Sequence, residues 1–354
     1  MKGLILSGGK GTRLRPFTYT GAKQLVPVAN KPVLFYAIED LVEAGITDIG
    51  IVIGDTGDQV REAVGDGAAF GARVTFIPQD APRGIAHGIK IASEFIGTDK
   101  FVLFLGDNFI RGGIVPQVSA FRDSSMNAQI ILYRLEDPSS MGVAVLGDNG
   151  RVQRLIEKPK QFVSPYAVIG IYMFDHHVFE AVNSIKPSAR GELEITDTIQ
   201  YLIDHGLDVC AHLLDSWWID TGKMADILEA NRLVLDILEP SYLGQVDSTS
   251  RIEGRVVLQK DAVVVNSTIR GPAIIGERTR IENAFVGPYT SIYHDCVIRD
   301  CEIEHSVVLE HSHVADAPAR IADSLIGRNV EISRAGGQTR TLKMMVGDYS
   351  KVGL

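Results

Sequence analysis

Residues 3–14 read GLILSGGKGTRL, in which a short apolar run leads directly into a glycine-rich loop. The run has the length of a buried strand, and further apolar runs of that length follow it, separated by longer amphipathic stretches. Strand-like runs cover residues 3–6, 49–53, 74–77 and 101–105, and helix-like runs cover residues 33–44, 59–64 and 85–95. This alternation predicts a parallel or mostly parallel sheet with helices on both faces. Ligands of such sheets bind at the carboxyl ends of the strands, where this loop lies.

The pattern becomes mixed beyond residue 128. Strand-like runs at 129–134, 143–146 and 168–174 precede a helical stretch at 197–205. These runs predict extra strands on the substrate side, so the expected fold is α/β, with a Rossmann-like mixed and mostly parallel sheet. A helix at 224–238 ends before Pro240, which predicts a domain boundary near residues 240–250.

Aliphatic residues recur every five or six positions beyond residue 251. The recurring residues are Ile252, Leu258, Val264, Ile269, Ile275, Ile281, Val286, Ile292, Ile298, Ile303, Val308 and Val314. This hexapeptide period predicts a parallel β-helix, in which each aliphatic side chain points into a prism and three hexads complete one coil. Resemblance to known hexapeptide-repeat proteins implies a left-handed coil. We therefore expect an α/β domain at 1–240 and a left-handed β-helix domain at 250–354.

Composition excludes several classes of protein. The 354 residues carry a formal net charge of -9 and show no cluster of Lys and Arg, so we expect no nucleic-acid partner. The three cysteines lack C-x-x-C spacing, which favours a reducing, cytoplasmic setting. Apolar runs have only strand length, so we expect a soluble protein with no membrane partner.

The loop at residues 7–14 has the composition of a phosphate-binding loop. Gly8, Gly9 and Gly11 allow backbone N–H groups to approach phosphate oxygens. Arg13 and Lys23 can neutralise a triphosphate and its pyrophosphate leaving group. The loop lacks the spacing of a P-loop and of a dinucleotide-binding turn, so neither an ATPase nor a dehydrogenase is favoured.

Residues 8–14, together with Pro16, Lys23 and Pro27, resemble the signature of the sugar-phosphate nucleotidyltransferases. Over residues 1–240 the chain resembles the glucose-1-phosphate thymidylyltransferases of this family, and the repeats resemble those of their long form. The resemblance implies a catalytic domain that transfers a thymidylyl group from dTTP to glucose 1-phosphate, with dTDP-glucose and pyrophosphate as products. It also implies that Thr12 and Gln24 contact the nucleotide.

Two aspartates follow apolar runs and are candidates for one magnesium site. Asp107 follows the run at 101–105, and Asp220 ends the run at 218–220. Mg²⁺ prefers carboxylate and phosphate oxygens, so two aspartates and the α-phosphate make a reasonable ligand set. Such an ion withdraws charge from the phosphorus under attack.

Glu157-Lys158-Pro159 resembles the sugar-site motif of the family, in which the carboxylate accepts hydrogen bonds from sugar hydroxyls and the ammonium holds the sugar phosphate. Gly142 and Val168 match positions whose backbone meets the sugar, and Asn108 is a further candidate contact. Arg190 adds positive charge against the sugar phosphate. We expect the catalytic set to be Arg13, Lys23, Asp107, Lys158 and Asp220.

Gln79 and the Gly84 backbone are the candidate base readers. A pyrimidine such as thymine offers an N3 donor between two carbonyl acceptors, which an amide and peptide groups can match. Thymine and uracil share this edge and differ by one methyl group, so a uridylyltransferase, or a transferase for another base or sugar 1-phosphate, stays open. A non-catalytic regulatory or scaffold homologue is the third alternative.

The histidines of the repeat region admit another activity. Hexapeptide β-helices include acyltransferases with a histidine base, and this chain has His294, His305, His311 and His313. Histidines at coil corners are more often solvent-facing turn residues, and His311-x-His313 is too sparse to indicate a metal site. Assembly is the commoner role of such coils, so we expect a homo-oligomer.

Overall fold

The computed structural model describes residues 1–9, 11–147, 150–334 and 346–353. Packing divides the chain into two compact units. The first contains residues 1–10, 21–25 and 33–220, and the second contains residues 11–20, 26–32 and 221–354. The predicted boundary at 240–250 lies inside the second unit, which also takes two short segments from the start of the chain.

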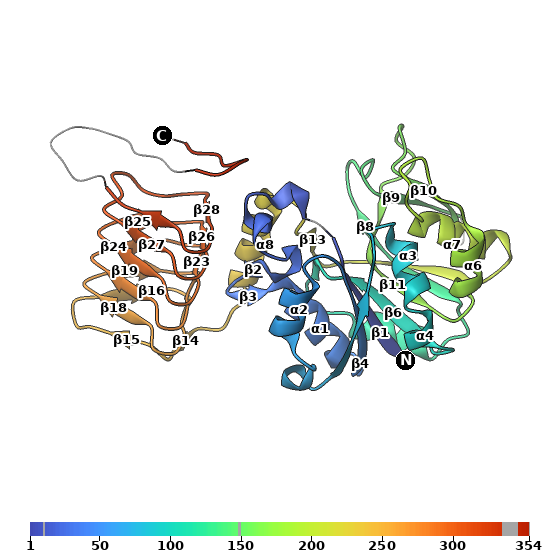
Figure 1. The fold of residues 1–354 in the computed structure, drawn as a ribbon, viewed down its shortest axis with the longest axis horizontal. Coiled ribbons are helices and arrows are strands. Elements are labelled where there is room, and N and C mark those ends of the chain that lie inside the picture. The colour runs from blue at the N-terminus through green and yellow to red at the C-terminus, as the bar shows by residue number, and fades with distance from the viewer. Residues whose placement is uncertain (10, 148–149, 335–345, 354) are drawn as a thin grey trace. The chain divides into compact units, whose positions relative to one another are not determined.

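A mixed sheet forms the centre of the first unit (Figure 1). Its parallel part has the order β6 (Phe101–Leu105), β1 (Lys2–Ser7), β4 (Asp48–Ile53) and β5 (Arg73–Pro78). The expected α/β sheet with strands at these places is confirmed.

The other part of this sheet is built around β11 (Tyr166–Phe174), which is antiparallel to β6. It also pairs antiparallel with β8 (Ala128–Arg134) and β9 (Gly142–Leu146). Strand β10 (Val152–Glu157) extends the sheet beside β9, and β12 (Val209–Leu213) pairs parallel with β8. These are the extra strands that the mixed sequence pattern predicts.

Helices cover both faces of the sheet because side chains alternate along its strands. On β1, Leu4 belongs to one apolar core and Ile5 to the other. The Leu4 core packs against α3 (Ile85–Ile91), α4 (Ser93–Ile96), α6 (Val178–Ser184) and α7 (Ile195–Asp204). The Ile5 core packs against α1 (Val33–Glu43), α2 (Gly57–Val64) and α5 (Val115–Arg122), beside the short 3₁₀ turn η4 (Ala68–Phe70).

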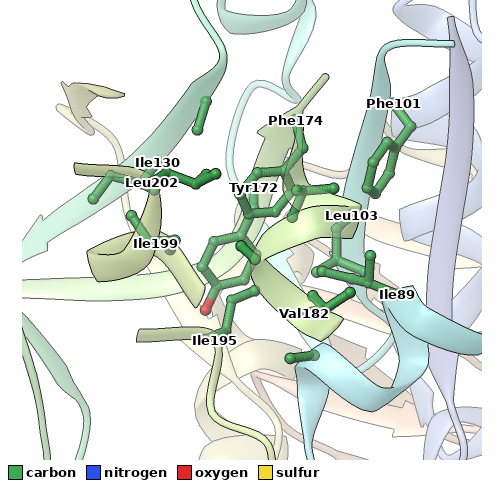
Figure 2. Packing of buried hydrophobic residues seen from close by; sticks show 14 of the residues in the cluster. Ile89, Phe101, Leu103, Ile130, Tyr172, Phe174, Val182, Ile195, Ile199 and Leu202 are labelled. Atoms are coloured by element: carbon green, nitrogen blue, oxygen red, sulfur yellow. The ribbon is translucent and has the colours of Figure 1, made fainter. Parts of the chain in front are cut away.

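The Leu4 core shows how aromatic and aliphatic side chains fill this layer (Figure 2). Tyr172 and Phe174 project from β11, with their ring centroids 6.1 Å apart. Ile89 and Val182 reach this core from helices α3 and α6. The predicted single helix at 85–95 is wrong in one detail, since Ala92 separates α3 from α4.

Two short strands and a 3₁₀ turn complete the carboxyl-end edge of the sheet. Strands β7 (Asn108–Ile110) and β13 (Trp218–Asp220) pair antiparallel, with Asp220 opposite Asn108. The turn η3 (Lys23–Leu25) packs against α1. Because β1 and β6 are parallel and adjacent, the loops that follow them leave the sheet side by side.

The second unit contains the left-handed β-helix, built from three parallel sheets in its described part. The first sheet contains β14 (Ser241–Tyr242), β17 (Val256–Leu258), β20 (Ala273–Ile275), β23 (Thr290–Ile292), β26 (Val307–Val308) and β28 (Leu325–Ile326). The second contains β15 (Gln245–Val246), β18 (Val263–Val265), β21 (Arg280–Glu282), β24 (Val297–Arg299), β27 (His313–Ala315) and β29 (Glu331–Ile332). The third contains β16 (Arg251–Glu253), β19 (Thr268–Arg270), β22 (Phe285–Val286) and β25 (Glu302–Ile303).

The aliphatic residues of the repeat fill the prism as predicted. From Leu258 to Val314 every one of them is 0% exposed, and only Ile252, in the first coil, is partly exposed. Strands of two or three residues suit this coil, since every strand from β17 to β27 carries at least one buried aliphatic side chain. The β-helix therefore has its own hydrophobic core.

Helix α8 (Met224–Leu235) also belongs to the second unit, and it ends three residues before the predicted end at 238. The hairpin of β2 (Pro27–Val28) and β3 (Lys31–Pro32) packs against it. The 3₁₀ turns η1 (Thr12–Leu14) and η2 (Phe17–Tyr19) lie in the same unit. Leu14, Val26 and Ile227 form a small apolar cluster there.

Within the described ranges, every helix falls short of the length and apolarity that a membrane-spanning segment requires. The thiols of Cys210, Cys296 and Cys301 are free.

Candidate functional site

The glycines after β1 allow two segments of backbone to approach closely. A Cβ added to Gly54, which follows β4, would lie 2.9 Å from the carbonyl oxygen of Gly8. A Cβ added to Gly8 would lie 2.6 Å from Oε1 of Gln79. At Gly54 the contact is with backbone, so glycine is required there on steric grounds, whereas Gly8 lies against the flexible side chain of the candidate base reader.

Gly11, Thr12 and Arg13 belong to the second unit. Gly11 has a φ of 60°, in the left-handed region, and directly precedes the turn η1 that contains Thr12 and Arg13. Thr18 donates a hydrogen bond of 2.6 Å to the Gly11 carbonyl oxygen. The side chain of Arg13 is exposed, so it is accessible to an anionic ligand.

Lys23 brings the two candidate metal ligands into one cluster. Lys23 is 8% exposed, and its ammonium is paired with the Asp107 carboxylate. Oδ1 of Asp220 lies 3.9 Å from the same ammonium nitrogen. A buried lysine of this kind depends on carboxylate partners for its charge. Residues far apart in the sequence thus converge at the carboxyl-end edge of the sheet.

This donor set fits a magnesium ion. Asp107 and Asp220 supply carboxylate oxygens, the hard ligands that Mg²⁺ prefers, and each has an oxygen near the Lys23 ammonium. Two carboxylates leave other coordination positions for phosphate oxygens and water. The structure therefore places the predicted metal ligands together.

Asn108 forms a hydrogen bond to Asp107 and so orients it. Its Nδ2 donates to Asp107 Oδ1 over 3.0 Å, and its Oδ1 accepts from the Gly170 backbone N–H (3.2 Å) and the Trp218 Nε1–H (2.7 Å). Asn108 is 3% exposed. The amide thus ties β7 to β11 and β13 and fixes the direction of one metal-site carboxylate.

Gln24 lies beneath the glycine-rich loop. It is 3% exposed, and its Nε2 would lie 3.8 Å from a Cβ added to Gly9. Its Oε1 is buried without a hydrogen-bond partner among the described residues. A buried acceptor of this kind suits a hydroxyl or N–H donor from a ligand in the loop.

The candidate base readers lie together. Gln79 follows β5, and its backbone N–H donates to the Ile53 carbonyl over 2.8 Å. Its side-chain Nε2 lies 2.9 Å from Nδ1 of His87 on α3. Gly84 has a φ of 101°, and a Cβ there would lie 2.4 Å from the Leu193 carbonyl oxygen. Only glycine fits this position, which precedes α3.

The candidate sugar-site residues form a second charged cluster. Glu157 lies opposite Gly142 in the β10–β9 pairing, and its Oε1 accepts from Arg190 over 3.0 Å. Lys158 Nζ lies 3.7 Å from the same oxygen. A Cβ added to Gly142 would lie 3.9 Å from the Cβ of Val168. The structure therefore gathers these five predicted residues at one place.

Two partners in this cluster have no counterpart in the sequence motifs. Glu194 is 6% exposed and accepts hydrogen bonds of 2.9 and 2.8 Å from Arg190, and Thr196 donates to Glu157 over 3.2 Å. Burial opposes the charge of Arg190, but the hydrogen bond and charge of Glu194 outweigh it and raise the pKa of the guanidinium. Arg190 therefore stays cationic at any pH at which the protein is folded. The sequence feature that indicates Glu194 and Thr196 is the run from 190 to 196, in which polar residues alternate with Leu193 and Ile195.

The β-helix histidines lie among other charged groups. Ligand atoms of His294, Asp295 and His311 lie within 4.8 Å of one another. Asp295 already accepts two hydrogen bonds, of 2.7 and 2.8 Å, from Arg278, and that pairing holds its pKa well below the usual range. Its charge is therefore compensated by arginine.

Comparison with known proteins agrees with this geometry. Residues 2–237 match the family model described as nucleotidyl transferase. The chain is 48% identical over 351 residues to a glucose-1-phosphate thymidylyltransferase of Streptomyces griseus and 50% identical over 353 residues to one of Streptomyces antibioticus, with 99% of each chain covered. Among solved structures, a Bacillus anthracis protein described as a glucose-1-phosphate thymidylyltransferase matches with a TM-score of 0.64 and 38% identity. That match covers 68% of this chain and 98% of the other.

The family model spans two thirds of the chain, and the two Streptomyces relatives match 99% of it. The chain belongs to the nucleotidyl transferase family.

Proposed function

We propose that this protein transfers a thymidylyl group from dTTP to glucose 1-phosphate, giving dTDP-glucose and pyrophosphate. The observation that carries the proposal is the convergence of Lys23, Asp107 and Asp220 beside the loop that follows β1. Similarity over 99% of the chain to two proteins named glucose-1-phosphate thymidylyltransferase supports the choice of substrates.

The reaction is a direct in-line displacement at the α-phosphorus. An oxygen of the sugar phosphate forms a new bond to this phosphorus, and the bond from the α-phosphorus to the bridging oxygen of the β-phosphate breaks. Pyrophosphate leaves with the electron pair of that bond. The nucleophile is already an anion at neutral pH, so no general base and no covalent enzyme intermediate are required.

The proposed catalytic residues position the reactants and stabilise charge. Lys23 and Arg13 neutralise the triphosphate and the departing pyrophosphate. Asp107 and Asp220 hold a divalent cation, Mg²⁺, which when bound withdraws charge from the α-phosphate. Gly8, Gly9, Gly11, Thr12 and Gln24 contact the nucleotide.

The Arg190 and Glu157 cluster holds the acceptor. Lys158 and Arg190 bind the sugar phosphate, and Glu157 accepts hydrogen bonds from sugar hydroxyls. The backbone at Gly142 and Val168 meets the sugar. Gln79 and the Gly84 backbone read the pyrimidine edge of the nucleotide.

We also propose the organisation of the protein around this reaction. Residues 1–240 form the catalytic domain, and residues 250–354 form a β-helix domain that assembles subunits into a homo-oligomer. The reaction takes place in the cytoplasm.

An oxygen-tracer experiment tests the proposed displacement. The protein is incubated with dTTP, Mg²⁺ and glucose 1-phosphate that carries ¹⁸O at every phosphate position, and the products are analysed by mass spectrometry. The proposal predicts that dTDP-glucose contains all the label and that pyrophosphate contains none. Label in the pyrophosphate, or no nucleotide sugar, contradicts the proposed reaction.

A further inference from the structure

Gln79 and His87 form a hydrogen-bonded pair whose direction is set by the surrounding charges. His87 lies on α3 and is 8% exposed, and its Nδ1 lies 2.9 Å from Gln79 Nε2. The other ring nitrogen, Nε2, lies 3.9 Å from Oδ1 of Asp80. A carboxylate favours the proton on the nitrogen that faces it, so Nε2 carries the hydrogen of the neutral ring.

This tautomer fixes the orientation of the Gln79 amide. Nδ1 then has a lone pair and accepts a hydrogen from the Gln79 NH₂ group. The amide oxygen of Gln79 must point the other way, and it lies against Gly8 in the candidate nucleotide-binding loop. Without His87 the amide could rotate by 180°, because its two orientations have nearly the same shape.

We propose that His87 is a positioning residue for base selection, which holds Gln79 so that its Oε1 accepts the N3–H of a thymine or uracil base. This inference rests on the proposed function and extends it. A pyrimidine such as cytosine has an unprotonated N3, which would face the Gln79 oxygen and gain no hydrogen bond. His87 therefore contributes to base selection without touching the base.

The charge state of His87 gives this arrangement a pH dependence. Burial lowers the pKa of His87; Asp80 opposes this shift, and Arg83 and Lys90 reinforce it. The neutral ring that accepts the amide hydrogen is therefore present at neutral pH and is lost only as the pH falls below the ordinary histidine range. A protonated ring has a hydrogen on Nδ1, which repels the Gln79 NH₂ group and favours the rotated amide.

Two substitutions test the proposal through the ratio of kcat/KM for dTTP to kcat/KM for dCTP. His87→Ala removes the acceptor, and the ratio falls about tenfold because one neutral hydrogen bond no longer fixes the amide. His87→Asn places an amide oxygen where Nδ1 lies and keeps the ratio within about threefold of the wild-type value.

His212→Ala is the matched control. Nε2 of His212 lies 3.1 Å from Nε2 of Gln117, so the substitution also removes a Gln–His pair. His212 lies on β12, which contains no candidate site residue. The dTTP-to-dCTP ratio of kcat/KM for His212→Ala stays at the wild-type value. A fall in His212→Ala equal to that in His87→Ala, or no fall in His87→Ala, overturns the inference.

The pH profile separates positioning from a purely structural effect. As the pH is lowered from 8 to below the ordinary histidine range, the dTTP-to-dCTP ratio of the wild type falls, whereas that of His87→Asn stays level because asparagine does not titrate. Parallel profiles for the two proteins contradict the proposal.

A spectroscopic measurement distinguishes failure of this inference from failure of the proposed function. Long-range ¹H–¹⁵N spectra of the whole protein at pH 7.5 report which ring nitrogen of His87 carries the hydrogen, without any turnover. A hydrogen on Nε2 supports the inference, and a hydrogen on Nδ1 overturns it. Absence of turnover with every nucleotide instead contradicts the proposed function.

Discussion

Lys23 is paired with two carboxylates of the first unit, those of Asp107 and Asp220. Its ammonium is buried, and the charges of the two carboxylates offset the hydration free energy that burial removes. The same carboxylates are the proposed metal ligands, so their negative charge both stabilises the buried Lys23 and binds the metal ion. Substitution of Lys23, Asp107 or Asp220 should therefore reduce catalytic activity strongly, even where the change in side-chain size is small.

Asp107→Asn tests the proposed metal site. The change keeps the shape of the side chain but removes a negative charge, so Mg²⁺ binds more weakly and the α-phosphate loses charge stabilisation. We expect kcat/KM to fall about a hundredfold or more. Pyrophosphate release measured over a range of magnesium concentrations checks this.

Asp99→Asn is the control for that substitution. Asp99 is half exposed and forms an ion pair of 3.5 Å with Lys2, so its loss should change the rate less than twofold. Wild-type magnesium dependence in Asp107→Asn would exclude Asp107 as a metal ligand.

Arg190→Ala tests the proposed acceptor site. Removal of a charge-assisted contact to the sugar phosphate should raise KM for glucose 1-phosphate about tenfold to a hundredfold, with KM for dTTP within about twofold of wild type. Steady-state kinetics with each substrate varied in turn measure both constants.

The comparison protein for Arg190→Ala is Arg151→Ala. Arg151 is 65% exposed and lies 3.6 Å from Asp208, which is not a candidate site residue. Its KM values should equal those of the wild type. An equal rise in both KM values for Arg190→Ala would place Arg190 outside the acceptor site.

At the residue scale, sequence motifs located the charged groups but not their partners. The parallel strands predict the place of Asp107, which follows β6, whereas Asp220 lies on β13, which pairs antiparallel with β7, and Lys23 lies in the turn η3. Trp218 and His87 act as partners of motif residues on other elements, and no local pattern marks them. Only the run from 190 to 196 indicated Glu194 and Thr196. The roles of all these side chains stay predictions.

Gly84 shows how an element begins at the site. Its φ of 101° and ψ of 167° lie in a region that only glycine adopts readily. A Cβ there also meets backbone, the Leu193 carbonyl oxygen, which cannot move aside as a flexible side chain can. The backbone that leads into α3 is therefore fixed by this residue.

Gly84→Ala should destabilise the protein by about 3 kcal/mol and raise KM for dTTP. Gly71→Ala is the control, because Gly71 also has a positive φ, 73°, but lies in the left-handed helical region with open space around it, and should cost only about 1 kcal/mol. Urea unfolding of both variants gives the two free energies. Equal losses would mean that strain alone, and not the contact with Leu193, restricts Gly84.

Asn231 links three elements of the second unit. It is 0% exposed, and its Oδ1 accepts from the Ala29 backbone (2.9 Å) and the Ser291 hydroxyl (2.6 Å). Its Nδ2 donates to the Tyr289 carbonyl over 3.1 Å. One side chain on α8 thus satisfies a turn of the early chain and a coil of the β-helix.

Asn231→Ala leaves these buried groups without partners and should lower the free energy of unfolding by about 3 kcal/mol. Asn183→Ala, at an exposed position at the end of α6, should change it by less than about 0.5 kcal/mol. Thermal and urea unfolding compare the two. A cost for Asn231→Ala as small as that for Asn183→Ala would show that water replaces the lost bonds.

At the element scale, prediction succeeded where the pattern is local. Each β-helix coil contacts its neighbours, so one aliphatic residue per strand is enough to locate Leu258 through Val314. The first two strands of the first coil, β14 and β15, were missed, because they carry Tyr242 and Val246, which are 55% and 40% exposed. The antiparallel partners of β11 were not predictable, since strand pairing depends on contacts between distant segments.

At the scale of the whole molecule, packing divides the chain differently from its sequence pattern. Residues 11–20 and 26–32 belong with α8 and the β-helix, although they interrupt the α/β unit in sequence. Periodicity cannot show this, because it reports on neighbours along the chain and not on the surface that a loop packs against. The second unit therefore includes Arg13, a proposed catalytic residue.

The number of subunits is a prediction at this scale. Sedimentation equilibrium of the full chain measures it directly, and we expect a mass that is a multiple of the 38.5 kDa subunit. A single species of subunit mass at micromolar concentration would contradict the proposed assembly role of the β-helix.

The central claim is thymidylyl transfer to a sugar 1-phosphate, and pyrophosphate release from a matrix of substrates tests it most directly. Each nucleoside triphosphate is combined with each of several sugar 1-phosphates, with and without Mg²⁺. We predict the highest kcat/KM for dTTP with glucose 1-phosphate and Mg²⁺, and about tenfold or more below it for UTP, which lacks one methyl group. Absence of pyrophosphate release in every combination would contradict the account.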